Sequence, residues 1–158
     1  MISEKKQEFT RKITQANSTG LIVILYDMTL TFLEDALIAY EAENWKEYRK
    51  SIEGARSCLD ELLSSLDLQY EIALRLHSLY FFFRRELGTA MALRNPEKIQ
   101  GVSKRIKELK KSYEQVASQD TSAPLMENTQ AVYAGLTYGK GSLNVDLADQ
   151  STNRGFRI

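Results

Sequence analysis

The chain has 158 residues, a length that fits one domain and can bury a sizeable core. Lysine plus arginine and aspartate plus glutamate both number 21, so the formal net charge is zero. A neutral chain has no long-range attraction to nucleic acid or to an anionic membrane. We therefore expect a partner that is recognised by shape and apolar contact, and we expect neither nucleic-acid binding nor membrane insertion.

The cysteine count and the N-terminal residues indicate the compartment. Cys58 is the only cysteine, which excludes an intrachain disulfide and a thiolate metal cluster. The first residues, MISEKKQEFTRK, are charged and lack the apolar core of a signal peptide. No apolar run approaches the length of a membrane span. These features predict a cytoplasmic protein.

The first two predicted helices differ in character. Residues 3–13 are mostly polar, with Phe9 and Ile13 as the main apolar side chains. They predict a short helix that needs tertiary support, because isolated helices of this length are marginal in water. Asn17 opens a run of good N-cap residues, which predicts a second helix over residues 19–42.

Three further helices follow in close succession. Asn44 is predicted to cap a third helix, which ends near residue 66. Asp67 is predicted to cap a fourth, which ends near residue 94. Asn95 and Pro96 combine a cap with a proline at the first helical position, which predicts the start of a fifth. The third and fifth helices each carry one narrow apolar seam: Trp45, Tyr48, Ile52, Ala55, Leu59, Leu62 and Leu66 on the third, and Ile99, Val102, Ile106, Leu109, Tyr113 and Val116 on the fifth.

Short connections between long helices force neighbours to run antiparallel. The predicted fold is therefore all-α: an antiparallel up-and-down four-helix bundle with a short N-terminal helix and an irregular C-terminal tail. We expect a bundle domain over residues 1–118, in which residues 1–16 form a covering segment. The composition changes after residue 118, and residues 119–158 contain half of the eight glycines. We expect this extension to pack on the bundle or on a neighbouring subunit.

The second helix has more apolar surface than a bundle needs. Two stripes with spacings of three and four residues lie side by side on it. The predicted core stripe is Leu21, Leu25, Met28, Phe32 and Ala36, and the second stripe is Val23, Tyr26, Leu30, Leu33 and Leu37. A helix that is apolar around most of its circumference must be covered by something besides the bundle.

The fourth helix repeats this pattern. Its predicted core stripe is Ile72, Leu76, Leu79, Tyr80, Phe83 and Leu87, and its second stripe is Tyr70, Leu74, His77 and Phe81. Arg84 and Arg85 follow the aromatic run. They are either solvated or paired with acids of a neighbouring helix, or they orient the carboxylates of a partner at the edge of the stripe. Gly88 lies inside this helix and predicts a close approach of another helix there.

Two interpretations of the second stripes remain open. In one, the N-terminal helix and the C-terminal tail lie over the stripes and complete a larger core. In the other, the stripes form a groove for a partner helix, and Phe9 and Ile13 are a removable cover. The two interpretations are compatible, because a marginal cover protects an apolar groove from aggregation.

The sequence offers no arrangement for catalysis. His77 is the only histidine, and it lacks the Glu-x-x-His spacing of di-iron bundles. No nucleophile motif and no glycine-rich phosphate loop after a strand occurs. We expect a binding protein with no catalytic residues, no metal and no cofactor, and not an enzyme. A metal or cofactor bound on purification would contradict this expectation.

Two segments resemble the flagellar secretion chaperone FliS, the flagellin export chaperone family. Residues 17–33, NSTGLIVILYDMTLTFL, are similar to the family segment at the start of its first long helix. Residues 76–87, LHSLYFFFRREL, are similar to its Leu-Tyr-x-x-x-Arg-Arg-Leu segment. The resemblance covers residues 9–116. The N-terminal Glu8-Phe9-Thr10 departs from the Asn-Pro-Tyr type of the family, and the tail is longer than usual.

The resemblance implies a cytoplasmic export chaperone that binds the C-terminal segment of flagellin, prevents premature polymerisation and delivers flagellin to the flagellar export apparatus. It also implies that the N-terminal segment occupies part of the binding surface when flagellin is absent. The expected partner-binding residues are Val23, Tyr26, Leu30, Leu33, Leu37, Tyr70, Leu74, Phe81, Arg84 and Arg85, under the cover of Phe9 and Ile13. The alternative is a structural or regulatory bundle whose extra apolar faces form a homodimer or larger homo-oligomer. The tail is expected to dock in the groove as a mimic of the client or to swap to another subunit.

Overall fold

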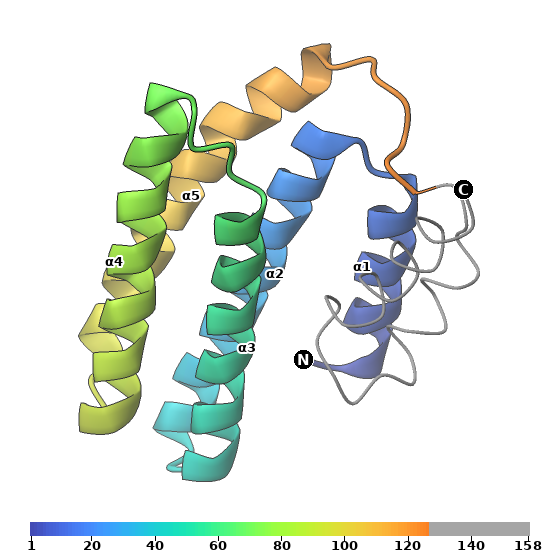
Figure 1. Ribbon diagram of the computed structural model, residues 1–158. Coiled ribbons are helices and arrows are strands. Elements are labelled where there is room, and N and C mark those ends of the chain that lie inside the picture. The colour runs from blue at the N-terminus through green and yellow to red at the C-terminus, as the bar shows by residue number, and fades with distance from the viewer. Residues whose placement is uncertain (127–158) are drawn as a thin grey trace, which may run out of the picture.

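The computed structural model describes residues 1–126. Five α-helices make up nearly all of this part of the chain, and it contains no strand (Figure 1). The helices are α1 Ser3–Gln15, α2 Ser18–Glu41, α3 Trp45–Ser64, α4 Glu71–Leu93 and α5 Pro96–Gln119. The predicted extension beyond residue 126 lies outside the described residues.

Three asparagines determine where helices begin. The side chains of Asn17, Asn44 and Asn95 each accept a hydrogen bond from a backbone N–H two or three residues ahead, at 2.9, 3.3 and 3.0 Å. Each bond satisfies one of the donors that a helix N-terminus leaves free. Pro96 occupies the first turn of α5, as predicted. The cap assignments for α2, α3 and α5 are confirmed.

The predicted cap of α4 is wrong. Asp67 accepts a hydrogen bond from the backbone N–H of Gln69 at 3.1 Å, which forms a turn before the helix. The helix begins only at Glu71, and the preceding Tyr70 makes no side-chain cap bond. Aspartate bonds equally well to a nearby N–H in a turn and at a helix start, so the sequence alone does not separate the two.

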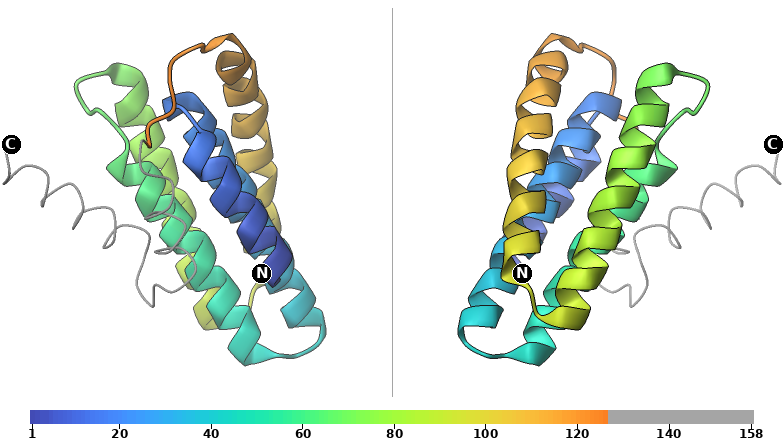
Figure 2. Two further views of the ribbon diagram at one scale, coloured as in Figure 1. Left: turned by 90° about the vertical axis from the view of Figure 1, so that its right-hand side faces the viewer. Right: turned by 90° about the vertical axis from the view of Figure 1, so that its left-hand side faces the viewer.

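The helices α2 to α5 form a closed ring, in which α2 contacts α3, α3 contacts α4, α4 contacts α5 and α5 contacts α2. The short connections make neighbours antiparallel, which confirms the predicted four-helix bundle. The short N-terminal helix is also confirmed: α1 packs on the outer side of α2, away from the centre of the ring (Figures 1 and 2). Because α2 contacts three helices, most of its circumference is covered.

The narrow seams of α3 and α5 face the bundle core as predicted. Tyr48, Ile52, Ala55, Leu59 and Leu62 of α3 are buried, as are Ile99, Val102 and Ile106 of α5. Val116, the last residue of the predicted α5 seam, is exposed. The single apolar stripe on each of these helices leaves only one orientation that buries it.

The close helix approach occurs at Gly54 of α3 rather than at Gly88 of α4. A Cβ placed on Gly54 would lie 2.5 Å from Cε1 of Phe32 on α2. Around Gly88 the nearest atom is Cζ of Arg56 at 4.0 Å, which leaves room for a methyl group. The prediction for Gly88 is therefore wrong, and the tight contact joins α2 to α3.

Candidate partner-binding surface

The second stripe predicted on α2 does not form one exposed surface. Tyr26 and Leu33 are fully buried in the bundle core. The Tyr26 hydroxyl hydrogen-bonds that of Tyr80 on α4, and burial raises the pKa of both phenols. The assignment of Tyr26 and Leu33 to a partner-binding surface is wrong for this structure, because neither side chain is accessible.

The predicted core stripe of α2 divides in the same way. Leu25 and Ala36 are buried, whereas Leu21, Met28 and Phe32 are only half-buried. The core-facing side of α2 therefore runs through residues of both predicted stripes. The angle between the stripes is small, so the sequence period alone cannot select which one faces the bundle axis.

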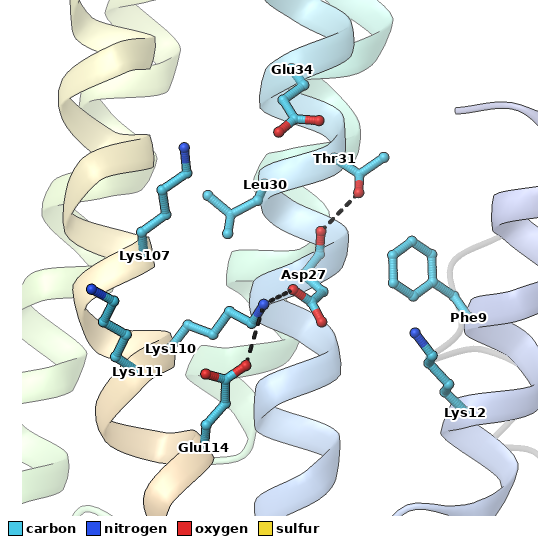
Figure 3. Close-up of a pocket in the computed structure, with 10 residues that line it drawn as sticks. All are labelled: Phe9, Lys12, Asp27, Leu30, Thr31, Glu34, Lys107, Lys110, Lys111 and Glu114. Carbon is cyan, nitrogen blue, oxygen red and sulfur yellow. Dashed lines mark hydrogen bonds and ion pairs between the residues drawn. The ribbon is translucent and has the colours of Figure 1, made fainter.

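A groove runs between α2 and α5, and we name it the α2–α5 groove. Its first hollow has a volume of about 470 Å³ and is bounded by α1 on the other side (Figure 3). The lining comes from Phe9 and Lys12 of α1, from Asp27, Leu30, Thr31 and Glu34 of α2, and from Lys107, Lys110, Lys111 and Glu114 of α5. Leu30 and Phe9 supply the apolar part of this lining.

A second hollow of about 380 Å³ continues the groove along the same two helices. It shares Glu34, Lys107 and Lys111 with the first hollow, so the two are neighbours. Leu37 is its apolar lining residue. Of the predicted α2 residues, Leu30 and Leu37 thus line the groove, and the half-buried Val23 lines neither hollow.

The rim of the groove carries an excess of lysines. Lys110 Nζ lies 2.6 Å from Asp27 Oδ1, and this hydrogen bond is the main cause that raises the pKa of the lysine. Lys107 and Lys111 are exposed and make no ion pair within the described part of the chain. These lysines lie between the residues of the predicted α5 seam, on the polar side of the helix. Their spacing of four residues on one face was the signal that could have placed them together.

The second stripe of α4 forms an exposed apolar surface, which we name the α4 outer stripe. Tyr70, Leu74 and Phe81 are 63, 52 and 52% exposed. The His77 ring lies beside that of Phe81, with centroids 5.4 Å apart. These side chains follow one another along one face of the helix, as the spacing predicted. The stripe leaves unburied apolar surface of the kind that marks interaction sites.

One residue of the predicted α4 core stripe is misplaced. Ile72 is 64% exposed, whereas Leu76, Tyr80, Phe83 and Leu87 are buried. Ile72 lies in the first turn of α4, where the adjacent Ala73 is the buried residue instead. Its exposure adds to the apolar surface at this end of the helix.

The two arginines of α4 have different surroundings. Arg84 Nε lies 2.8 Å from Asp60 Oδ1, so this guanidinium joins α4 to α3. Arg85 is exposed and lies over the ring of Phe82, with Cζ 5.7 Å from the ring centroid. Arg105 of α5 also lies over Phe82, at 5.1 Å. Of the pair, Arg85 is the residue that remains accessible to a partner.

The N-terminal helix covers a different face of α2 from the predicted one. Phe9 and Ile13 are buried in a small cluster with Ala16 and Ile24, against which Leu21 and Met28 pack. Residues 21 and 28 belong to the stripe that the sequence assigned to the bundle core. The prediction that α1 lies over the second stripe is therefore wrong, although Phe9 also reaches the edge of the α2–α5 groove.

The described residues give no indication of a catalytic or metal centre. In residues 1–126, no three histidine, cysteine or acidic side chains are grouped as metal ligands. Cys58 is buried, and burial raises the pKa of its thiol to about 12, far above that of a nucleophilic cysteine. None of the helices described is long and apolar enough to cross a membrane.

The described residues thus form an all-α helical bundle with a lysine-rimmed groove and a separate exposed apolar stripe, and exposed apolar surface of this kind marks interaction sites. The chain belongs to the family described as flagellar protein FliS, whose model matches residues 1–120. No individual curated protein matches the sequence. The match includes all five helices and ends where the irregular segment after α5 begins. Membership in this family of chaperones implies a flagellar export chaperone with flagellin as its partner.

Proposed function

We propose that the chain is a cytoplasmic export chaperone that binds the C-terminal segment of flagellin, prevents its premature polymerisation and assists its delivery to the flagellar export apparatus. The observation that carries this proposal is the family match over residues 1–120. The surplus of accessible apolar surface on α2 and α4 supports it, because a protein that only builds its own bundle has no need of that surface.

Two surfaces are available for the client. The α2–α5 groove offers the half-buried Leu37 and the edge of Leu30, which is only 9% exposed, beneath a rim of lysines. The α4 outer stripe offers Tyr70, Leu74 and Phe81. No α4 residue lines either hollow of the groove, so the two surfaces are separate. A disordered segment suits such a divided site, because an extended chain can wrap around a bundle and contact both.

Burial of apolar client surface supplies the binding free energy. Part of that gain offsets the entropy lost when a disordered segment becomes ordered. The bound segment is then no longer free to join a growing filament. Arg85, at the end of the α4 outer stripe, is positioned to pair with client carboxylates.

The test is a calorimetric titration with a peptide of the flagellin C-terminal segment. Phe81→Asp places a charge on the α4 outer stripe. We expect the dissociation constant to rise by about tenfold or more, because the variant no longer gains the free energy of burying the exposed half of the Phe81 ring against the client. Leu93→Asp is the control, since Leu93 is also an exposed apolar residue, at 69%, but is the last residue of α4 and lies outside the stripe. Equal affinity of the two variants would remove the α4 outer stripe from the site.

The exposed α4 outer stripe also favours one alternative, in which two copies of the chain bury it against each other. Light scattering on the purified protein separates the two functions. A stable dimer that ignores the flagellin peptide would support the structural or regulatory module. A monomer that binds the peptide would support the chaperone.

A further inference from the structure

The irregular segment after α5 runs back to the N-terminal part of the chain, where α1 is connected to α2. Residues 120–126 run from the end of α5 to the connection between α1 and α2, as the orange trace in Figure 1 shows. The backbone N–H of Leu125 donates a hydrogen bond to the carbonyl oxygen of Ala16 at 3.0 Å. Ala16 is the residue that ends α1. The segment therefore contacts the point where α1 departs from α2.

Asn17 connects this segment to α2. Its Oδ1 accepts the cap hydrogen bond from the backbone N–H of Gly20 at 2.9 Å. Its Nδ2 donates to the carbonyl oxygens of Asp120 and Ser122, at 3.2 and 3.3 Å. One side-chain amide thus uses its acceptor for the helix and its donor for the returning segment.

A second set of hydrogen bonds stiffens the same contact. The carboxylate of Asp120 accepts a hydrogen bond from the hydroxyl of Thr19 on α2. It also accepts bonds from the backbone N–H and the hydroxyl of Ser122. The segment is therefore folded on itself and bonded to the first turn of α2.

The end of the segment reaches the apolar cluster beneath α1. Met126 packs against the cluster of Phe9, Ile13, Ala16 and Ile24. That cluster is the apolar contact between α1 and α2, the helix on which α1 packs. The segment thus contacts the carbonyl oxygen at the end of α1 through Leu125, and the buried side chains of α1 through Met126.

We infer that residues 120–126 are a strap that holds α1 against α2, so that release of the strap frees α1 and uncovers the apolar face of Leu21, Ile24 and Met28. A helix as short as α1 is marginal on its own, so its docking depends on each tertiary contact that it makes. Part of the strap lies beyond the residues that match the family, which end at residue 120.

The strap also has a consequence that rests on the proposed function. Phe9 and Lys12 of α1 line the α2–α5 groove, so a client in that groove can extend onto the face that α1 covers. If it does, its apparent affinity is reduced in proportion to the fraction of molecules in which α1 is docked. A strap that favours the closed state therefore lowers the affinity for flagellin, and its release raises it. The C-terminal part of the chain then controls a site at its N-terminal part.

Asn17→Asp in the full chain separates the two roles of Asn17. Aspartate caps helices as well as asparagine does, so α2 keeps its cap, but the donor to the strap is replaced by a carboxylate that faces two carbonyl oxygens. We expect the amides of α1 to exchange about tenfold faster with deuterium, because the strap loses the two hydrogen bonds that Asn17 donates to it. Exchange in α3 should be unchanged.

Asn44→Asp is the matched control. Asn44 caps α3 by the same kind of bond, and its amide nitrogen donates to no other group within residues 1–126. Met126→Ala weakens the strap without altering any helix, which gives a second variant should Asn17→Asp not fold. If α1 exchanges at the wild-type rate in both strap variants, the strap does not hold α1 and the inference is wrong.

A titration of the same variants with the flagellin C-terminal peptide distinguishes the two claims. Faster exchange in α1 together with tighter peptide binding supports the strap and its control of the site. Faster exchange with no peptide binding by any form supports the strap and overturns the proposed function. Faster exchange with unchanged affinity shows that the client does not use the face under α1, which overturns the control of affinity by the strap.

Discussion

Two glycines in helix interiors should respond in different ways to the same substitution. Gly54 of α3 and Gly101 of α5 both lack a side chain inside a helix, which costs each helix about 1 kcal/mol relative to alanine. Around Gly101 nothing lies within 4 Å of an added Cβ. Gly101→Ala should therefore stabilise the protein by about 1 kcal/mol or slightly less.

At Gly54 a steric cost opposes the same gain. The added Cβ would lie 2.5, 2.6 and 2.8 Å from three carbons of the Phe32 ring, so the ring or the helix must move. Overpacking of this kind costs about 1–3 kcal/mol, which equals or exceeds the gain in helix propensity. We expect Gly54→Ala to be less stable than Gly101→Ala by about 1–3 kcal/mol.

Urea unfolding followed by circular dichroism measures this difference. The double variant Gly54→Ala/Phe32→Leu is the check on the cause, because removal of the ring should recover part of the loss and give a coupling energy. If both alanine variants are stabilised equally, Phe32 of α2 does not lie against Gly54 of α3. The orientation of α2 in the bundle would then be contradicted.

Three further outcomes follow from burial and hydrogen bonding. Because burial raises the pKa of Cys58 to about 12, the thiol should not react with Ellman's reagent at pH 8 until the protein is unfolded, and rapid reaction of the folded protein would show that Cys58 is accessible. Leu33→Asp should unfold the bundle, since it places an unpaired charge at a fully buried site; a cooperative melting transition near that of the wild type would contradict this. Hydrogen bonds, first from Ser122 and then from Thr19, lower the pKa of Asp120 below its usual 3.8. The ionised carboxylate therefore strengthens the strap fully at pH values above 3.8, and this contribution is lost as the pH falls through the lower pKa of the folded protein. A carboxyl ¹³C titration by NMR should show the Asp120 midpoint below 3.8 and an upward shift in Thr19→Val; a midpoint at 3.8 in both would exclude the bond.

The elements with a single apolar stripe were predictable from the sequence. The seams of α3 and α5 and the asparagine caps are local signals, and each has only one arrangement that buries the stripe or satisfies the helix end. The outer stripe of α4 was also predicted, because the residues between its members, apart from Ala73, are polar or belong to the predicted core stripe.

The orientation of α2 was not predictable from the sequence. Its apolar residues extend around most of the helix, so the periodicity allows several orientations, and only its contacts with α1, α3 and α5 select one. The groove lysines and the strap were missed for a related reason. Lys107 and Asn17 have ordinary local roles on the helix surface and at the cap, and their further contacts come from residues far away in the chain.

The binding of flagellin itself is the most direct test of the proposed function. Calorimetric titration of the wild-type chain should be performed with full-length flagellin and with flagellin that lacks its C-terminal segment. The proposal predicts saturable binding to the full-length protein and a loss of binding to the truncated one. Equal binding to both forms, or no binding to either, would contradict it.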